Sequence, residues 1–303
     1  MTINAPSAQT DSGGLLYATN TGSSSVITMP TLSVKYAYAY TSGGMMYIGG
    51  GPLTLTLNTL TAKYLSTGPL GKGAGLYLAN TGACVINSNP ATITSSVAGL
   101  HGGFIYRDGG DSFALDLRTA TVTSTYANSG SGGFGYFTSG AVASSINLQS
   151  VTFKDSTAAL DGGLIYTAGS TPLTITIPGS TFTSSKAYVN GGMFSLNHAS
   201  TTTITISSAS SFTSISAIKN GGFLYAGSSC TTVDVIMSGT ASTLKKVSAG
   251  NHGGAFYLGQ AGVSSFALTN AVFDTVTSDQ NGGAFAVLGT NLNAFTSTSS
   301  TFN

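Results

Sequence analysis

The charged residues that could carry acid–base or metal chemistry are few and scattered, and one stretch of the chain holds the best cluster. The densest run is Arg107-Asp108-Gly109-Gly110-Asp111, which Asp116 and Arg118 follow. Hydrolysis of a glycosidic bond uses two carboxylates about 5–9.5 Å apart, and a calcium ion takes about six to eight oxygen ligands. The chain has nine scattered aspartates and no glutamate. We therefore interpret the stretch as a solvated turn with local charge pairing, and we expect no catalytic residue, no metal site and no enzyme activity.

Tyrosine is the second residue type that could carry a function, because it recurs at a fixed spacing. Eight tyrosines stand three positions after a pair of small residues, usually Gly-Gly. They are Tyr17, Tyr47, Tyr77, Tyr106, Tyr136, Tyr166, Tyr225 and Tyr257. A tyrosine ring buries well while its hydroxyl still finds a partner, and its faces can stack on sugar rings. The spacing therefore predicts either an interface between copies or a glycan-binding surface.

The small-residue pair itself recurs ten times, at intervals of 29 to 32 residues. The pairs end at Gly14, Gly44, Ala74, Gly103, Gly133, Gly163, Gly192, Gly222, Gly254 and Gly283. A fixed period of this length is the signature of a solenoid, in which each repeat buries its apolar face against its neighbours. We expect one repeat domain over residues 1–303, which is either complete or a segment of a longer repeat protein.

Each repeat divides into three short strand signals separated by turn residues. One repeat gives the apolar run Leu164–Tyr166 after its glycines, the alternating run Leu173–Ile177, and a third strand around Phe182. Strands stacked in register from repeat to repeat form parallel sheets. Glycine pairs suit corners where a Cβ would clash or φ is positive. The sequence therefore predicts an all-β fold, a right-handed parallel β-helix of about ten coils with three strands per coil.

A large apolar residue precedes each glycine pair at a fixed distance and marks the predicted core. The column comprises Val34, Ile93, Val122, Phe153, Phe182, Phe212, Leu244 and Phe273, and the same spacing places Tyr64 in it. Buried side chains of this kind stabilise a fold by about 1.5–3 kcal/mol each. One residue further along, Lys245 and Asp274 are expected to form an ion pair between adjacent rungs.

The first strand of the repeat is apolar on both faces. Leu16, Met46 and their equivalents form one row, and Leu15, Met45 and their equivalents accompany the tyrosines in the other. We expect the Leu16 row inside and the tyrosine row, together with the Leu15 row, outside. The opposite choice would also leave an apolar stripe outside, which soluble monomers rarely tolerate. Since no insertion is long enough to cover the stripe, another chain is the expected cover.

The two ends of the chain occupy the same phase of the repeat. Ile3-Asn4 corresponds to Phe302-Asn303, so one copy could continue the hydrogen-bond ladder of another. A bare terminal rung is an unpaired sheet edge, which pairs readily with a further strand. These four residues are the predicted end-to-end contact.

The remaining candidate residues favour no chemistry. His101 and His252 share one position five coils apart, and His198 falls in another turn. Cys84 and Cys230 are about 24 Å apart at about 4.8 Å per rung, so we expect two buried thiols without a disulfide. Thr-x-Thr pairs such as Thr174/Thr176 are typical of ice-binding solenoids, but Asn87, Asp116, Asn147 and Asp234 interrupt the array.

The composition excludes several classes of partner. Only 6% of the residues are charged and the net charge is +1, so no basic surface is available for nucleic acid or anionic lipid. Serine, threonine and glycine interrupt every apolar stretch before it reaches the length of a membrane span. We expect no nucleic-acid partner, no membrane span and no cofactor.

The repeat resembles that of polymorphic outer membrane proteins and related surface adhesins. Those repeats pair a Phe-x-x-Asn motif with Gly-Gly-Ala-Ile/Leu-Tyr, to which the run 151–166 and Gly253-Gly254-Ala255-Phe256-Tyr257 are similar. The resemblance covers almost the whole chain and implies a pectin-lyase-like β-helix, secreted or at the cell surface, used for adhesion. The chain departs from the family where Asn is expected, with Ser96, Ser156, Ser185 and Ile215.

Taken together, these patterns predict an extracellular structural protein, a self-assembling fibre or surface-layer subunit. Its partner would be itself, through head-to-tail stacking and lateral packing of solenoids. The alternative is a surface adhesin or carbohydrate-binding module that binds surface glycans through the tyrosines. A polysaccharide-active enzyme and an ice-binding protein are the less favoured alternatives.

Overall fold

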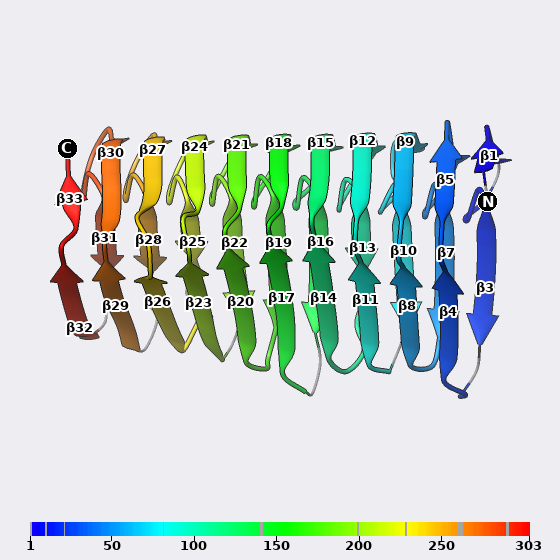
Figure 1. Ribbon diagram of the computed structural model, residues 1–303, viewed down its shortest axis with the longest axis horizontal. Helices are drawn as coiled ribbons and strands as arrows, with labels where there is room; N and C mark the ends of the chain where they lie inside the picture. Colours follow the sequence, from blue (N-terminus) through cyan, green and yellow to red (C-terminus); the bar gives the residue numbers. More distant parts are fainter. Residues whose placement is uncertain are drawn as a thin grey trace.

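The chain folds into a β-solenoid whose coils are stacked along one long axis (Figure 1). The computed structural model describes residues 2–9, 11–20, 22–80, 82–139, 142–198, 200–227, 229–259, 263–288 and 291–303. These residues form three parallel sheets and no helix, in about ten turns of about 30 residues. The predicted all-β parallel solenoid with three strands per coil is therefore confirmed. No helix that could cross a membrane occurs in the described part of the chain.

Each sheet takes one strand, or one pair of short strands, from every coil. The first sheet follows the glycine pairs and contains β3 (Leu16–Asn20), β7 (Met46–Gly50), β10 (Leu76–Asn80), β13 (Ile105–Arg107), β16 (Gly135–Ser139), β19 (Ile165–Gly169), β22 (Phe194–His198), β25 (Leu224–Ala226), β28 (Phe256–Gly259) and β31 (Phe285–Leu288). The second sheet contains β4 (Ser25–Met29), β8 (Leu53–Leu57), β11 (Cys84–Ser88), β14 (Phe113–Arg118), β17 (Ser144–Gln149), β20 (Leu173–Pro178), β23 (Thr201–Ser207), β26 (Thr232–Ser238), β29 (Val263–Thr269) and β32 (Asn291–Thr298). The third sheet contains β1 (Thr2–Asn4), β2 (Ser7–Ala8), β5 (Leu32–Lys35), β6 (Tyr38–Ala39), β9 (Leu60–Thr67), β12 (Ala91–Ala98), β15 (Ala120–Ala127), β18 (Thr152–Ala158), β21 (Thr181–Ala187), β24 (Ser211–Ala217), β27 (Ser242–Ala249), β30 (Ala271–Ser278) and β33 (Thr301–Phe302).

The core column of the third sheet is buried. Its members are at most 1% exposed: Val34, Ile93, Val122, Phe153, Phe182, Phe212, Leu244 and Phe273. The ring centroids of Phe153 and Phe182 are 5.5 Å apart, and those of Phe182 and Phe212 are 5.1 Å apart. Each Cα pairs directly with the next coil, as in Phe182 with Phe212. The column therefore runs through the centre of the solenoid as one apolar stack.

The placement of Tyr64 in this column is wrong. The strand register pairs Val34 with Ala62, and Ala62 with Ile93. From Ala62 to Ala74 the chain takes twelve residues, against ten from Ile93 to Gly103. Counting back from the glycine pair therefore misses by two residues, because the turn after β9 is longer. Tyr64 is instead 49% exposed.

The part of each coil that lies in the third sheet bends at one residue with left-handed backbone geometry. Tyr64 (φ 56°), Ser184 (φ 58°) and Ser214 (φ 57°) are examples. The bend lets two successive side chains point outward before the strand returns to the core: Thr183 and Ser184 are partly exposed, and Ser185 is buried. The Oγ of Ser185 then donates a hydrogen bond of 2.7 Å to the carbonyl of Gly192. Ser96 and Ser156 form the equivalent bonds to Gly103 and Gly163, so these serines tie the third sheet to the glycine corner.

The glycine pair is required for two separate reasons. The first glycine has positive φ, as at Gly162 (φ 66°). The second lies so close to the next coil that a Cβ on Gly163 would come 2.1 Å from the carbonyl oxygen of Gly192. Both reasons predicted from the sequence are confirmed.

The corner after the glycines also corrects the expected faces of the first strand. The chain turns between the two apolar rows, so residues adjacent in sequence both point inward. Met45 and Phe134, in the row expected outside, are 0% exposed, as is Met46 of the inner row. The external stripe therefore consists of the tyrosines without the Leu15 row.

Candidate functional site

The tyrosines of the first sheet form a ladder along one face of the solenoid. Six consecutive rings stack from Tyr17 to Tyr166, with centroid separations of 4.8 to 5.1 Å. Ser195 then interrupts the ladder, and Tyr225 and Tyr257 stack again at 5.3 Å. All eight predicted interface tyrosines therefore belong to one column, divided into a run of six and a run of two. We call this column the tyrosine ladder.

Neighbouring rings cover one another's faces in the tyrosine ladder. Tyr17, at the first rung, is 55% exposed, whereas Tyr106 in the middle is 5% exposed. The other six are partly buried. Because stacking occupies the ring faces inside each run, the ladder presents mainly ring edges and hydroxyl groups. Stacking of a sugar ring on a tyrosine face is therefore limited to the ends of the runs.

Polar side chains on both sides hold the middle of the ladder. The Lys72 Nζ donates to the Tyr106 hydroxyl at 3.1 Å and lies 4.6 Å from that ring's centroid. The His101 ring is 4.7 Å from that of Tyr136, and the Tyr77 hydroxyl donates to an Asp108 carboxylate oxygen at 3.3 Å. These contacts fix the orientation of the central rings.

Burial raises the pKa of the central ladder hydroxyls above the ordinary tyrosine value of about 10. Desolvation, followed by the charge of Asp108, raises the pKa of Tyr106 to about 12. Desolvation likewise raises the pKa of Tyr77 and Tyr136. Burial, with a smaller contribution from Lys72, lowers the pKa of His101. At neutral pH these tyrosines are therefore uncharged hydrogen-bond donors.

The turn residue directly before each glycine pair belongs to a second column, in which amide and carboxylate side chains are hydrogen-bonded from rung to rung. The backbone N–H and the Nδ2 of Asn190 both donate to Asp161 Oδ1, at 3.0 and 3.1 Å. The Nδ2 of Asn220 donates to Asn190 Oδ1 at 3.1 Å. Burial, offset by the bonds from Asn190, raises the pKa of Asp161. These bonds link Asp161, Asn190 and Asn220 across successive rungs, and the Oδ1 of Asn220 has no partner among the described residues.

An exposed apolar ridge was missed by the sequence reasoning. It lies in the turns between the third and first sheets, and its members are 42% to 80% exposed. We call Tyr40, Leu70, Leu160, Tyr188 and Ile218 the apolar ridge. Each of these five stands three or four positions before the second small residue of a pair, and this spacing was the available signal. The ridge and the tyrosine ladder border the same corner of the solenoid.

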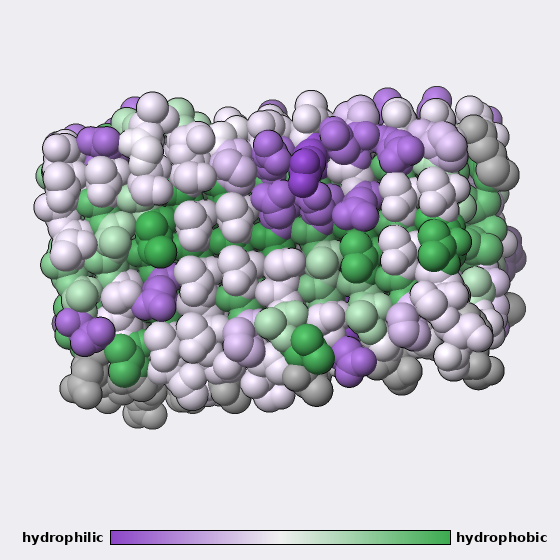
Figure 2. Space-filling view, turned by 60° about the horizontal axis from the view of Figure 1, so that its bottom comes forward, coloured by the Kyte–Doolittle hydropathy of each residue, from purple (hydrophilic) through white to green (hydrophobic). Residues whose placement is uncertain are grey.

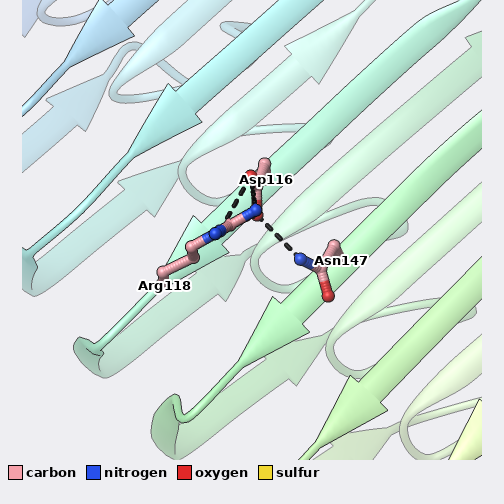
Figure 3. Close-up of polar contacts among 3 residues, drawn as sticks. All are labelled: Asp116, Arg118 and Asn147. Carbon is pink, nitrogen blue, oxygen red and sulfur yellow. Dashed lines mark hydrogen bonds and ion pairs between the residues drawn. The ribbon is translucent and has the colours of Figure 1, made fainter.

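The charged residues between Arg107 and Arg118 lie on two different strands, and the fold places some at the surface and one in the interior. Asp116 and Arg118 lie on β14 and form an ion pair of 2.8 Å, and Asn147 on β17 donates to Asp116 at 2.8 Å (Figure 3). They belong to a hydrophilic patch over the middle coils of the second sheet (Figure 2). The expected local pairing is therefore confirmed for Asp116 and Arg118. It is wrong for Arg107, which is fully buried instead of lying in a solvated turn.

The remaining sequence candidates stay apart. Cys84 and Cys230 are buried and neither forms a disulfide. His198 is buried, while His252 lies beside Asn281. No group of three metal-ligating side chains occurs among the described residues. Lys245 and Asp274 form the predicted ion pair between adjacent rungs, at 3.2 Å.

The terminal residues lie at opposite ends of one column. Ile3 pairs with Val34 on the first rung, and Phe302 pairs with Phe273 on the last. The Phe302 ring stacks on Phe273 at 4.8 Å and remains 48% exposed. Asn4 and Asn303 follow them on the same rungs. The predicted correspondence of phase is therefore confirmed, while a contact between copies stays a prediction.

Comparisons with known protein families, with curated proteins and with solved structures found no match to this chain.

Proposed function

We propose that this chain is a structural protein, secreted or at the cell surface, whose β-solenoids associate side by side through the tyrosine ladder. The observation that carries the proposal is the run of six stacked tyrosines along one face, with ring edges and hydroxyls outward. Tyrosine edges bury apolar area against a second surface while each hydroxyl can still form a hydrogen bond. A ladder of this kind offers the same contact on every rung.

The electrostatics of the ladder support association between identical copies. Its central hydroxyls are neutral at physiological pH, and burial moves the pKa of Tyr77, Tyr106 and Tyr136 further above that range. The whole chain carries a net charge of only +1. Two copies therefore meet with little mutual repulsion.

The apolar ridge adds a second reason for lateral packing. Its side chains, with Leu70 at 80% exposure, form two groups at one corner, Tyr40 with Leu70 and Leu160 with Tyr188 and Ile218. Soluble monomers rarely leave large contiguous apolar patches bare. The apolar ridge and the tyrosine ladder together give each solenoid one corner at which a second copy can pack.

End-to-end stacking is the second part of the proposal. Among the described residues, the strands that contain Ile3 and Phe302 are the two edges of the third sheet. Such an edge accepts a further parallel rung, from the same chain or from another copy. The shared column would let that rung continue the core stack.

The test replaces Tyr106, Tyr136 and Tyr166 with serine. Serine already occupies the ladder at Ser195, where β22 keeps its pairing with β19 and β25. We expect the triple variant to keep its circular dichroism spectrum and to lose lateral assemblies in sedimentation velocity and electron microscopy. Substitution of Ile3 and Phe302 with aspartate should instead shorten assemblies without changing their lateral packing.

The matched control is Tyr36→Ser with Tyr64→Ser. These two rings also stack, at 5.0 Å, and are exposed, but they lie on the third sheet. The control should assemble like the parent. A parent chain that stays monomeric at high concentration, or a ladder variant that assembles unchanged, would contradict the proposal. Binding of the monomer to a glycan array would then favour the carbohydrate-binding alternative.

A further inference from the structure

The interior of the solenoid holds a permanent positive charge. Arg107 is fully buried at the end of β13 and occupies a column whose neighbours are Leu78 and Phe137. An arginine cannot lose its proton in a protein, and an uncompensated buried ion is strongly unfavourable. The guanidinium therefore needs acceptors and, above all, a counter-charge.

Backbone carbonyls supply part of what the guanidinium needs. Its Nη2 donates to the carbonyls of Gly82 and Ser112, at 3.3 and 3.1 Å. Its Nη1 donates to the carbonyl of Thr138. The guanidinium carbon also lies 5.7 Å from the Phe113 ring centroid. The Nε has no hydrogen-bond partner in the described part of the chain.

No carboxylate pairs with this arginine among the described residues. The ion pairs found there join Arg118 to Asp116 and Lys245 to Asp274, both at the surface. Asp111 acts on Arg107 only through space and is the weakest of the influences on its pKa. The carbonyl dipoles therefore solvate the cation without neutralising it.

The thiol of Cys84 is the ionisable group that lies against the guanidinium. The Ser112 carbonyl accepts from both Arg107 Nη2 and the backbone N–H of Cys84, the latter at 2.9 Å. Burial lowers the pKa of Arg107, while the charge of Cys84 and a side-chain hydrogen bond to it oppose that shift. Cys84 is 1% exposed, so water does not screen the contact.

The elements around Cys84 contribute no competing charge to the interior. The neighbouring strand β8 has no titratable residue. On the other neighbour, β14, Asp116 and Arg118 pair with each other on the outer face. On β13, the other titratable side chain is Tyr106, whose hydroxyl bonds to Lys72 in the external ladder.

We propose that Cys84 is a thiolate in the folded protein and is the counter-ion of Arg107. A cation beside a cysteine favours the thiolate, which is the nucleophilic form of the residue. The site is therefore a nucleophilic sulfur held inside the fold, and small soft electrophiles are the class of reagent that a thiolate takes.

Cys230 provides a matched control within the same chain. It is as deeply buried as Cys84, but its sulfur faces the Leu196 carbonyl at 3.5 Å. Burial, partly opposed by hydrogen bonds from the His198 and Gly227 backbone, raises the pKa of the Cys230 thiol. Two cysteines of equal burial are thus expected in opposite protonation states.

The experiment measures the ultraviolet absorbance of the thiolate in single-cysteine chains at neutral pH. Cys230→Ser, which retains Cys84, should show about one thiolate per folded chain, lost on unfolding because a free cysteine is mostly protonated at this pH. Cys84→Ser, which retains Cys230, should show none. The absence of a thiolate signal in folded C230S, or its presence in C84S, would overturn the assignment.

Variants of Arg107 provide a second readout. Arg107→Gln should remove the thiolate signal from the C230S background, and Arg107→Lys should restore it by returning a cation. If Arg107→Gln does not fold, the comparison of C230S with C84S still decides the question. A thiolate that persists in folded Arg107→Gln would show that another group stabilises it.

Discussion

Two aromatic stacks lie along part of this solenoid, one inside and one outside. Interior Phe153, Phe182 and Phe212 stack at 5.5 and 5.1 Å, and the external tyrosines stack at 4.8 to 5.1 Å. The spacing is nearly the same because the hydrogen bonds between rungs set it at about 4.8 Å in both places. The rings follow the backbone. What distinguishes the two ladders is burial.

The break at Ser195 shows the difference in another way. The external ladder loses its tyrosine there, yet β22 keeps its pairing on both sides. The interior column contains no such polar residue, since every residue from Val34 to Phe273 in the column is apolar. The interior stack therefore holds the coils together, whereas the external stack is available for contact with another molecule.

The largest expected effect is on the interior ladder. Phe182→Ala should lower the free energy of unfolding by about 3–5 kcal/mol, because the ring is fully buried between two others and the cavity cannot collapse. Phe302→Ala, at the exposed last rung of the same column, is the control and should cost less. Chemical denaturation followed by circular dichroism measures both. If Phe182→Ala and Phe302→Ala lowered the unfolding free energy equally, burial would not be what distinguishes the two positions.

A buried histidine should make the interior sensitive to acid. His198 bonds through Nδ1 to the Thr171 carbonyl at 3.1 Å, and its Nε2 has no partner among the described residues. Burial, partly opposed by that bond, lowers the pKa of His198. Its contribution to stability is thus present above the unfolded value of about 6.5 and is lost as the pH falls toward the folded value.

His198→Gln tests this by removing the titration. The unfolding free energy of the parent should fall more steeply below about pH 6.5 than that of the variant, by up to about 1.4 kcal/mol per pH unit. Burial also lowers the pKa of His101. Because both chains retain His101, its titration adds the same slope to both plots of unfolding free energy against pH. Equal slopes of unfolding free energy against pH in the two chains below about pH 6.5 would contradict the low pKa assigned to His198.

The external ladder should respond more weakly than the interior one. Tyr166→Ser removes one ring from the end of the run of six and reproduces the natural situation at Ser195. We expect a loss of about 0.5–1.5 kcal/mol, the value of an aromatic pair beyond its buried area. The same denaturation measurement applies. A loss as large as that of Phe182→Ala would mean that both ladders hold the fold.

The smallest effect is expected for the outward pair beside the interior column. Lys245 and Asp274 lie one residue along from Leu244 and Phe273, and the bond from Lys245 lowers the pKa of Asp274. Exposed pairs of this kind contribute little to stability. Lys245→Ala should therefore leave the denaturation midpoint unchanged within error. A clear shift would show that outward contacts also stabilise the stack.

Much of the architecture follows from the repeat alone. The period of the glycine pairs predicts the coils, since stacking needs the same corner in every rung, and the fixed distance to the next pair predicts the core column from Phe153 to Phe273. It also predicts the contact between Lys245 and Asp274. The rule fails at Tyr64, because a turn two residues longer shifts the count without changing the register of the strands.

The sequence by itself determined the parallel solenoid and the alignment of its tyrosines, because both depend on period and a rung spacing common to all coils. Only the tertiary structure decided what each corner encloses. The chain turns sharply after the glycines, so the Leu15 row and the Leu16 row both reach the core. At the end of β13 Arg107 points inward to backbone carbonyls and Cys84, although the next residue, Asp108, is charged and exposed. A linear pattern records which residues alternate along a strand, but the direction of a side chain at a corner is set by the coils above and below it.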